Sequence, residues 1–253
     1  MLTWSNTTAT GASKATAVGP LYVAGNTYAV ALWCPSARDL TLFNGNANSV
    51  TQEAARTSTT CFMRGVSEKI RIQTSSGAPW IWRRICFAHR GNSPFNTNQP
   101  GDTPINSATQ YIDSSQGMGR LFLNQNVNTM GNTQAAQFEI LFRGRAGQDW
   151  GDPLIAPIDT RRVDLKSDKT VRISSGNANG ILREYKRWHP MNKNITYEDD
   201  ENGEVEDTSY FSVDDKRGMG DYYIMDIFVP GTGAGTGDLL QVSSTATLYW
   251  HEK

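Results

Sequence analysis

The stretch "EKIRIQT", residues 68 to 74, alternates polar and apolar side chains along its whole length. In an extended chain Ile70 and Ile72 would point to one side, and Lys69, Arg71 and Gln73 to the other. This alternation is typical of a half-buried β-strand, which has one face on a core and the other in water. We therefore expect a strand at these residues.

The same pattern recurs along the chain in about nine segments, close to the eight strands of a jelly roll. The composition agrees, because 23 Gly, 10 Pro and only 19% charged residues favour short strands and loops over long helices. We predict an all-β fold, a single eight-stranded jelly-roll β-sandwich over residues 1–253 with long inter-strand loops. The other segments are "TYAVALWC" (27–34), "WIWRRICFA" (80–88), "AQFEILFRG" (136–144), "KTVRISS" (169–175), "ILREYKRWH" (181–189), "KNITYED" (193–199), "DYYIMDIFVP" (221–230) and "LLQVSSTATLYWH" (239–251).

Two connections are much longer than ordinary hairpin loops. Residues 88–120 are rich in Asn, Ser, Gly and Pro, and residues 200–220 form a second polar stretch. Long ordered loops in a compact β domain usually carry function. We expect neighbouring molecules to bury them.

The formal net charge is only −1, but the charges are segregated along the chain. Residues 51–90 hold seven Arg or Lys against two Glu, and residues 161–193 hold nine against three carboxylates. Residues 198–215 carry nine carboxylates and no Lys or Arg. This distribution is typical of a surface that meets a polyanion on one side and basic partners on another.

The stretch "PWIWRRICF" (79–87) interleaves aromatic and basic side chains, and "REYKRWH" (183–189) does so again. Two interpretations remain open. Each can be a sandwich strand with Arg at its edge, or a contact for single-stranded nucleic acid, where Arg binds phosphates and aromatic rings stack on bases. On the second interpretation the candidate DNA-binding, lumen-facing residues are Arg64, Arg71, Trp82, Arg83, Arg84, Arg183, Lys186, Arg187 and Trp188.

The acidic stretch "EDDENG" (198–203) resembles an EF-hand loop only at its start, because Ser209 stands where a bidentate Glu would be needed. We interpret it as a solvated acidic loop, with contact to a basic neighbour or adventitious Ca²⁺ as alternatives. The candidate subunit-interface residues are Glu198, Asp199, Asp200, Glu204 and Asp207.

No spacing in the sequence identifies a catalytic, metal or cofactor site. Three cysteines without a C-x-x-C pair argue against a disulfide framework and a zinc site. The glycine run "GTGAGTG" (231–237) lacks the helix that a phosphate-binding loop needs. We expect no enzymatic activity and no cofactor.

No apolar run reaches the length of a spanning helix, and the amino-terminal residues lack the pattern of a signal peptide. We expect a soluble protein that is intracellular when made and has no membrane partner.

Two blocks carry a resemblance to a known family. "TTCFMRGVSEKIRIQTSSGAPWIWRRICF" (59–87) and "RWHPMNKNITYEDDENG" (187–203), followed by a carboxyl end that reads "TLYWHEK", resemble the capsid proteins of genomoviruses. These are small circular single-stranded DNA viruses, some of which infect fungi, with capsids related to those of geminiviruses. The resemblance implies a jelly-roll subunit, an icosahedral shell of about sixty copies, and packaging of circular single-stranded DNA. It also implies location in the virion and, during assembly, in the host nucleus.

The sequence departs from this family at its beginning. Capsid proteins of the group typically start with an Arg- and Lys-rich arm, whereas Lys14 is the only basic residue among the first 37 here. We expect that the arm lies outside the given sequence, so its functions are assigned to no residue.

Two other functions remain as alternatives. A lectin-like glycan-binding jelly roll is suggested by 7 Trp and 9 Tyr, since aromatic rings also stack on sugars. A hydrolase on the same fold would need a convergent acid and base pair, which the spacing does not reveal.

Overall fold

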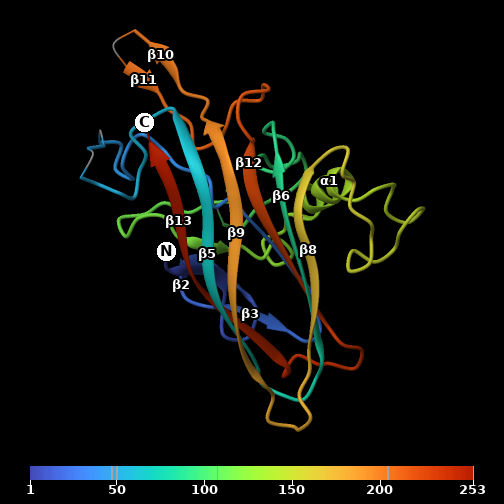
Figure 1. Cartoon of the computed structure of the whole chain (residues 1–253). Helices are drawn as coiled ribbons and strands as arrows, with labels where there is room; N and C mark the ends of the chain where they lie inside the picture. Colours follow the sequence, from blue (N-terminus) through green and yellow to red (C-terminus); the bar gives the residue numbers. More distant parts are fainter. Residues whose placement is uncertain (47, 50, 107, 204, 253) are drawn as a thin grey trace.

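The computed structural model describes residues 1–253 except 47, 50, 107, 204 and 253. Eight strands form two four-stranded antiparallel sheets that pack face to face (Figure 1). We call the sheet with the order β3-β13-β5-β9 the open sheet, and the sheet with the order β4-β12-β6-β8 the covered sheet. The open sheet contains β3 (Leu21–Ala24), β13 (Leu239–Glu252), β5 (Thr60–Thr74) and β9 (Leu182–Thr196), and the covered sheet β4 (Ala29–Trp33), β12 (Asp221–Pro230), β6 (Trp80–His89) and β8 (Asp164–Ile173).

The pairing of these strands is nested along the chain. The first of the eight pairs with the last (β3 with β13), the second with the seventh (β4 with β12), the third with the sixth (β5 with β9), and the fourth with the fifth (β6 with β8). A long antiparallel hairpin that rolls up on itself produces this order, which is the double Greek key of a jelly roll. The prediction of an all-β jelly-roll sandwich is confirmed.

The described residues contain thirteen strands, so five lie outside the two main sheets. Three form a small sheet in which β1 pairs with both β2 and β7, and two form a projecting hairpin. Their bounds are β1 (Thr3–Thr7), β2 (Ser13–Val18), β7 (Arg120–Phe122), β10 (Asp200–Asn202) and β11 (Val205–Asp207).

One expected strand is wrong. Residues 136–144 were expected to be extended, but most of them lie in the helix α1 (Gly131–Leu141). The carboxylate of Asp102, from the preceding long loop, accepts hydrogen bonds from the backbone N–H groups of Asn132 (2.9 Å) and Thr133 (2.7 Å). An anion at that end of a helix satisfies free N–H groups and interacts favourably with the helix dipole. A residue about thirty positions away therefore stabilises the helix.

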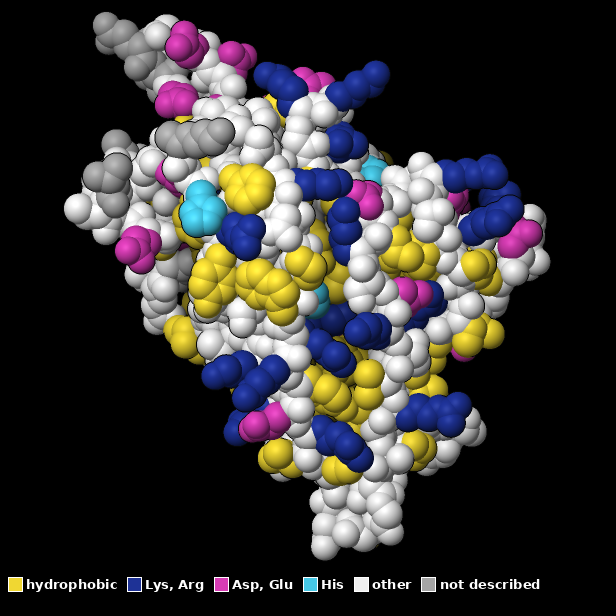
Figure 2. Space-filling view, in the orientation of Figure 1, with side chains coloured by type: hydrophobic (Ala, Val, Ile, Leu, Met, Phe, Trp, Pro, Cys, Tyr) yellow, Lys and Arg dark blue, Asp and Glu magenta, His cyan; other side chains and the backbone are white. Residues whose placement is uncertain are grey.

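The connections differ in length between the two ends of the sandwich. Residues 25–28, 75–79, 174–181 and 231–238 make four short connections, whereas residues 34–59, 90–163 and 197–220 make three long ones. The molecule narrows toward the end of the short connections and is broad at the other, as Figures 1 and 2 show. The molecule is therefore wedge-shaped.

The outer face of the covered sheet is buried by the longest connection. Phe87 of β6 packs against Phe95 with ring centroids 5.0 Å apart, and Leu141 and Phe142 at the end of α1 belong to the same apolar cluster. By contrast, no element of the described chain pairs with or covers most of the outer face of β5, β9 and β13, where polar side chains alternate with buried ones. The strands β4, β6 and β12 are thus buried on both faces, whereas the open sheet is bare on one.

Between the sheets lies a buried network of charged side chains. Arg84 donates to Glu68 (2.5 Å) and to both oxygens of Asp226 (2.7 and 2.9 Å). Arg120 donates to the same two carboxylates, at 2.9 Å to Glu68 and 2.7 Å to Asp226. Burial alone would raise the pKa of Glu68, but Arg84 and Arg120 lower it well below its usual value. Two cations and two anions therefore neutralise each other across the core.

Removing one side chain of this buried network should strongly destabilise the folded protein. Arg120→Ala leaves two buried carboxylates with a single guanidinium, and breaking a buried pair typically costs about 3–5 kcal/mol of unfolding free energy. Urea unfolding measures this loss. Arg161→Ala is the matched control, because Arg161 is exposed and should change stability by about 0.5 kcal/mol or less. A near-neutral Arg120→Ala variant would contradict the importance of the network.

A second buried carboxylate, Asp221, begins β12. It accepts hydrogen bonds from the backbone N–H and the hydroxyl of Ser212, and so fixes the end of the long acidic connection. Burial is the main cause that raises the pKa of Asp221, to about 7; the hydrogen bonds from Ser212 act in the opposite direction, and the charges of Asp214 and Glu198 add to the rise. The folded protein therefore holds this proton more tightly than the unfolded chain does.

The raised pKa of Asp221 determines whether the unfolding free energy rises or falls with pH. Between about pH 4 and about pH 7 the folded state binds more protons at Asp221 than the unfolded state, so the unfolding free energy falls as the pH rises. Each pKa unit is worth about 1.4 kcal/mol. Asp221→Asn should flatten this part of the pH profile, measured by urea unfolding, whereas Asp207→Asn on the exposed hairpin should leave it unchanged. A profile with the same slope in Asp221→Asn would contradict the assignment.

Candidate nucleic-acid interface

The bare side of the open sheet carries a band of cations, which we call the open face. The alternation of β5 directs Lys69 and Arg71 outward, and the register of β9 places Lys186 beside Lys69 and Glu184 beside Arg71. Arg64 lies on the same side, near the bulge of β5. Four cations thus face one carboxylate at the outward positions of β5, β9 and β13, and none of the four forms an ion pair among the described residues.

The pair Lys69 and Lys186 is unfavourable by itself. The two residues are direct partners across antiparallel strands, and Thr245 of β13 flanks Lys69 on its other side. Like charges in this position destabilise a sheet, because their side chains lie close together. An anion bound between them would remove this repulsion. The arrangement therefore favours a negatively charged partner over open water.

Aromatic side chains lie next to these cations on the open face. Trp188 and Tyr249 are 51% and 48% exposed, and their ring centroids are 5.8 Å apart. Phe62 and His251 form a second, stacked pair at 6.4 Å. Figure 2 shows hydrophobic side chains and Lys or Arg side by side over β5, β9 and β13. Aromatic rings among cations can stack on bases while the cations bind phosphates.

Gly65 makes room for one of these rings. It lies at a bulge in β5 with a φ of +149°, and a Cβ atom there would lie 2.9 Å from the Trp188 indole and 2.4 Å from the His189 carbonyl oxygen. Only glycine leaves this space free. The indole of Trp188 can therefore lie over β5 toward Tyr249.

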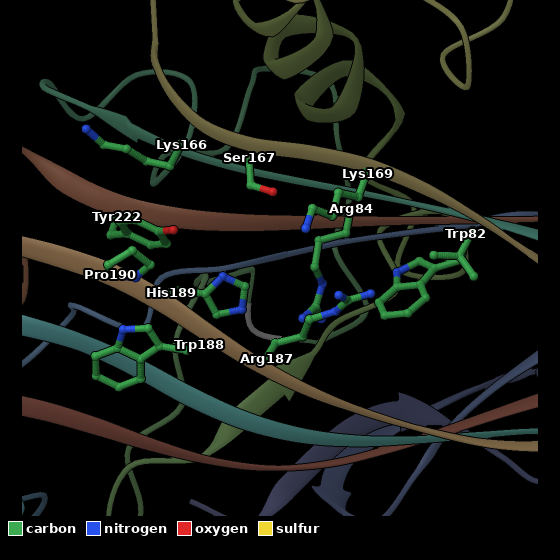
Figure 3. A pocket seen from close by; sticks show the side chains of 11 residues that line it. Trp82, Arg84, Lys166, Ser167, Lys169, Arg187, Trp188, His189, Pro190 and Tyr222 are labelled. Carbon is green, nitrogen blue, oxygen red and sulfur yellow. The ribbon is translucent and has the colours of Figure 1, made fainter.

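A cleft opens at one edge of the sandwich, where β8 and β9 end their respective sheets. The hollow measures about 170 Å³, and Lys169 of β8 and Arg187 of β9 lie on its walls. In the close-up of Figure 3 the guanidinium of Arg187 lies next to that of Arg84, and the amine of Lys169 lies on the other side of the Arg84 side chain. Figure 2 shows Lys and Arg side chains along the boundary between the two strands. The complete lining is Trp82, Arg84, Lys166, Ser167, Lys169, Val171, Arg187, Trp188, His189, Pro190 and Tyr222.

The residues that the sequence predicts to contact DNA lie on different parts of the structure. Arg64, Arg71, Lys186 and Trp188 are exposed on the open face. Arg183 and Arg187 lie on the opposite side of β9, and Arg187 lines the cleft.

Three of the residues predicted to contact DNA are buried within the chain and are not part of the open face. Trp82, Arg83 and Arg84 are only 1%, 4% and 5% exposed. They belong to β6, which lies between β12 and β8 in the covered sheet and is buried on both faces. Arg84 is part of the buried network, Arg83 pairs with Asp168 (2.6 Å), and the Trp82 indole N–H donates to Asp226 (2.8 Å). Trp82 and Arg84 contact the cleft only from its floor.

The acidic residues predicted to lie at a subunit interface also differ in their exposure. Glu198, Asp200 and Asp207 are exposed, the last two as direct partners in the hairpin β10–β11 that projects from the broad end (Figure 1). Asp199 is a correction, because its carboxylate pairs with the buried guanidinium of Arg56 within the same subunit. Glu204 lies outside the described residues.

Sequence reasoning missed several residues of both surfaces. Lys69 and Tyr249 lie on the open face, and Lys169 lies in the cleft. Lys69 had a signal, since it alternates with the buried Ile70 in the opening stretch. No sequence pattern pointed to Tyr249 or Lys169. Tyr249 lies beside Trp188, and Lys169 lines the same cleft as Arg187, but Trp188 and Arg187 belong to a strand that is distant in the sequence.

The residues that the structure describes include no group of three or more His, Cys, Asp or Glu side chains suited to a metal ion. In the same part of the chain, no helix is both long and apolar enough to cross a membrane. A scan against protein-family models and a search of curated proteins find no match to this chain.

Proposed function

We propose that this protein is the shell-forming subunit of a capsid that packages circular single-stranded DNA, and that the DNA lies against the open face. The observation that carries the proposal is the unbalanced pair Lys69 and Lys186 next to the exposed rings of Trp188 and Tyr249. Cations and stacking rings on one bare sheet suit a flexible polyanion whose bases are unpaired. Binding of this kind neutralises phosphates and reads no base sequence.

The shape of the subunit supports self-assembly. Short connections at one end and long ones at the other make a wedge, which suits heterologous contacts that close into a shell. The long connections cover the outer face of one sheet and leave the other bare, so the two faces differ chemically. The resemblance of residues 59–87 and 187–203 to genomovirus capsid proteins supports the same conclusion.

On this proposal the partners are further copies of the chain and the DNA genome. The protein would reside in the virion, and in the host nucleus during assembly. No catalytic step or cofactor is needed. A glycan-binding module is the second candidate, favoured only by the exposed pair Trp188 and Tyr249, and neutral sugars would not use the neighbouring cations.

The open face makes a direct prediction about DNA affinity. Lys69→Ala/Lys186→Ala should weaken binding of an oligodeoxythymidylate, measured by fluorescence anisotropy over a range of salt. The slope of log K against log salt should fall by about 1.4, or about 0.7 for each lost phosphate contact. The melting temperature should stay equal or rise, because the repulsion between the two lysines is removed.

The matched control is Arg143→Ala/Arg145→Ala, two exposed cations on the long connection beside the covered sheet. It should leave the slope unchanged. If both double variants behave alike, the open face is not the DNA surface. Binding of neutral glycans with no salt dependence would favour the second candidate.

Assembly is tested by electron microscopy of the purified full chain with single-stranded DNA. We expect closed particles of uniform diameter, because identical wedges repeat one contact around closed symmetry axes. A protein that stays monomeric across salt and pH, with or without DNA, would contradict the shell-forming role.

A further inference from the structure

The cleft between β8 and β9 is a hollow that the packing of the subunit leaves open. The two strands are the free edges of their sheets and do not pair with each other in the described chain. Trp82 and Tyr222 form its floor, and both are 1% exposed. Val171 and Pro190 lie on its sides. The hollow is therefore lined largely by rings and apolar groups.

Polar groups on the floor are already engaged within the subunit. The Trp82 indole N–H donates to Asp226. The two nitrogens of His189 lie 3.1 Å from Glu68 and 3.5 Å from the sulfur of Cys86. Arg84 is neutralised in the buried network. To a ligand, the floor thus offers ring surface and no free charge.

Two cations that have no carboxylate partner in the described part of the chain also line the cleft, beside its floor of Trp82 and Tyr222. Lys169 of β8 and Arg187 of β9 both line the cleft, and among the described side chains no carboxylate pairs with either. Lys166 is nearby but donates to Asp164 at 2.5 Å. The site therefore combines an apolar interior with positive charge beside it, which is complementary to a ligand with a flat apolar part and an anionic part.

The volume of the cleft limits the size of the flat, apolar part of such a ligand. A dry cavity of about 150 Å³ holds one benzene ring, and this one measures about 170 Å³. One six-membered ring can be enclosed within this volume, whereas the fused rings of a purine would extend out of the open side of the cleft. A pyrimidine base satisfies the limit.

The cleft is continuous with the open face. Trp188 is exposed there and also lines the cleft. Along β9, Lys186 and Trp188 point to the open face while Arg187, between them, points to the cleft. A strand of DNA on the open face can therefore turn around the edge of β9 and place one base in the hollow.

We propose that the cleft captures a single splayed pyrimidine base of bound single-stranded DNA, with the adjoining phosphate held by Lys169 and Arg187. This inference rests on the proposed DNA-binding function and adds base-class selectivity to it. Stacking and enclosure of one base favour pyrimidine tracts, and the rest of the strand is bound without regard to sequence.

The test compares oligodeoxythymidylate and oligodeoxyadenylate of about 12 nucleotides, a length within the usual site size for single strands. Wild-type protein should bind the thymidylate about fivefold or more tightly, the lower limit for one stacked base. Lys169→Ala/Arg187→Ala should lose most of this ratio. Val171→Phe, which fills the hollow without changing charge, should lose it as well.

Lys69→Ala/Lys186→Ala is the matched control, because it should weaken both oligonucleotides alike and keep their ratio. Comparing ratios between variants cancels the intrinsic stacking of each oligonucleotide. If wild type shows no preference, or if both cleft variants keep it, the inference is wrong while the DNA-binding proposal stands. If neither oligonucleotide binds wild type, the DNA-binding proposal itself fails.

Discussion

The buried pairing of Arg84 and Arg120 with Glu68 and Asp226 is the constraint on which the rest of the structure depends. These side chains come from β6, β7, β5 and β12, so one charge-balanced cluster joins both sheets and the small third sheet. The cost of taking four charges out of water is offset only when every partner is in place. The same cluster binds Trp82 and His189, and so determines the floor of the cleft. Core and surface are therefore coupled through these contacts.

A second principle is the difference between the two sheets. In the covered sheet, β4, β6 and β12 are buried on both faces because α1 and its flanking loops pack on the outer one. The open sheet keeps the alternation of a half-solvated sheet, and its polar positions are free to carry chemistry. Lys and Arg on the edge strands β8 and β9 have a structural role as well, since they discourage edge-to-edge pairing. Lys186 lies on the edge strand β9, but its partner Lys69 lies on the inner strand β5, where that explanation does not apply.

The sequence alone predicts the fold class well and the site only in part. Alternation in residues 68–74 identified β5 and its outward face, because a period of two is a local property. It failed for 136–144, where α1 depends on the carboxylate of Asp102 in another loop. It also failed for Arg83 and Arg84, because alternation cannot show whether a strand has one covered face or two. The cleft could not be predicted, since it exists only where the edges of two sheets meet.

The nested strand order has a consequence for how the molecule is made. β13 comes last of the eight strands, yet it lies between β3 and β5 near the middle of its sheet. Its partner β3 is separated from it by more than two hundred residues, so among the paired strands this contact closes the longest loop. During synthesis, the earlier strands must wait for β13 to leave the ribosome before their sheet is complete. The surface with Trp188 and Tyr249 therefore forms only after β13 has joined the sheet.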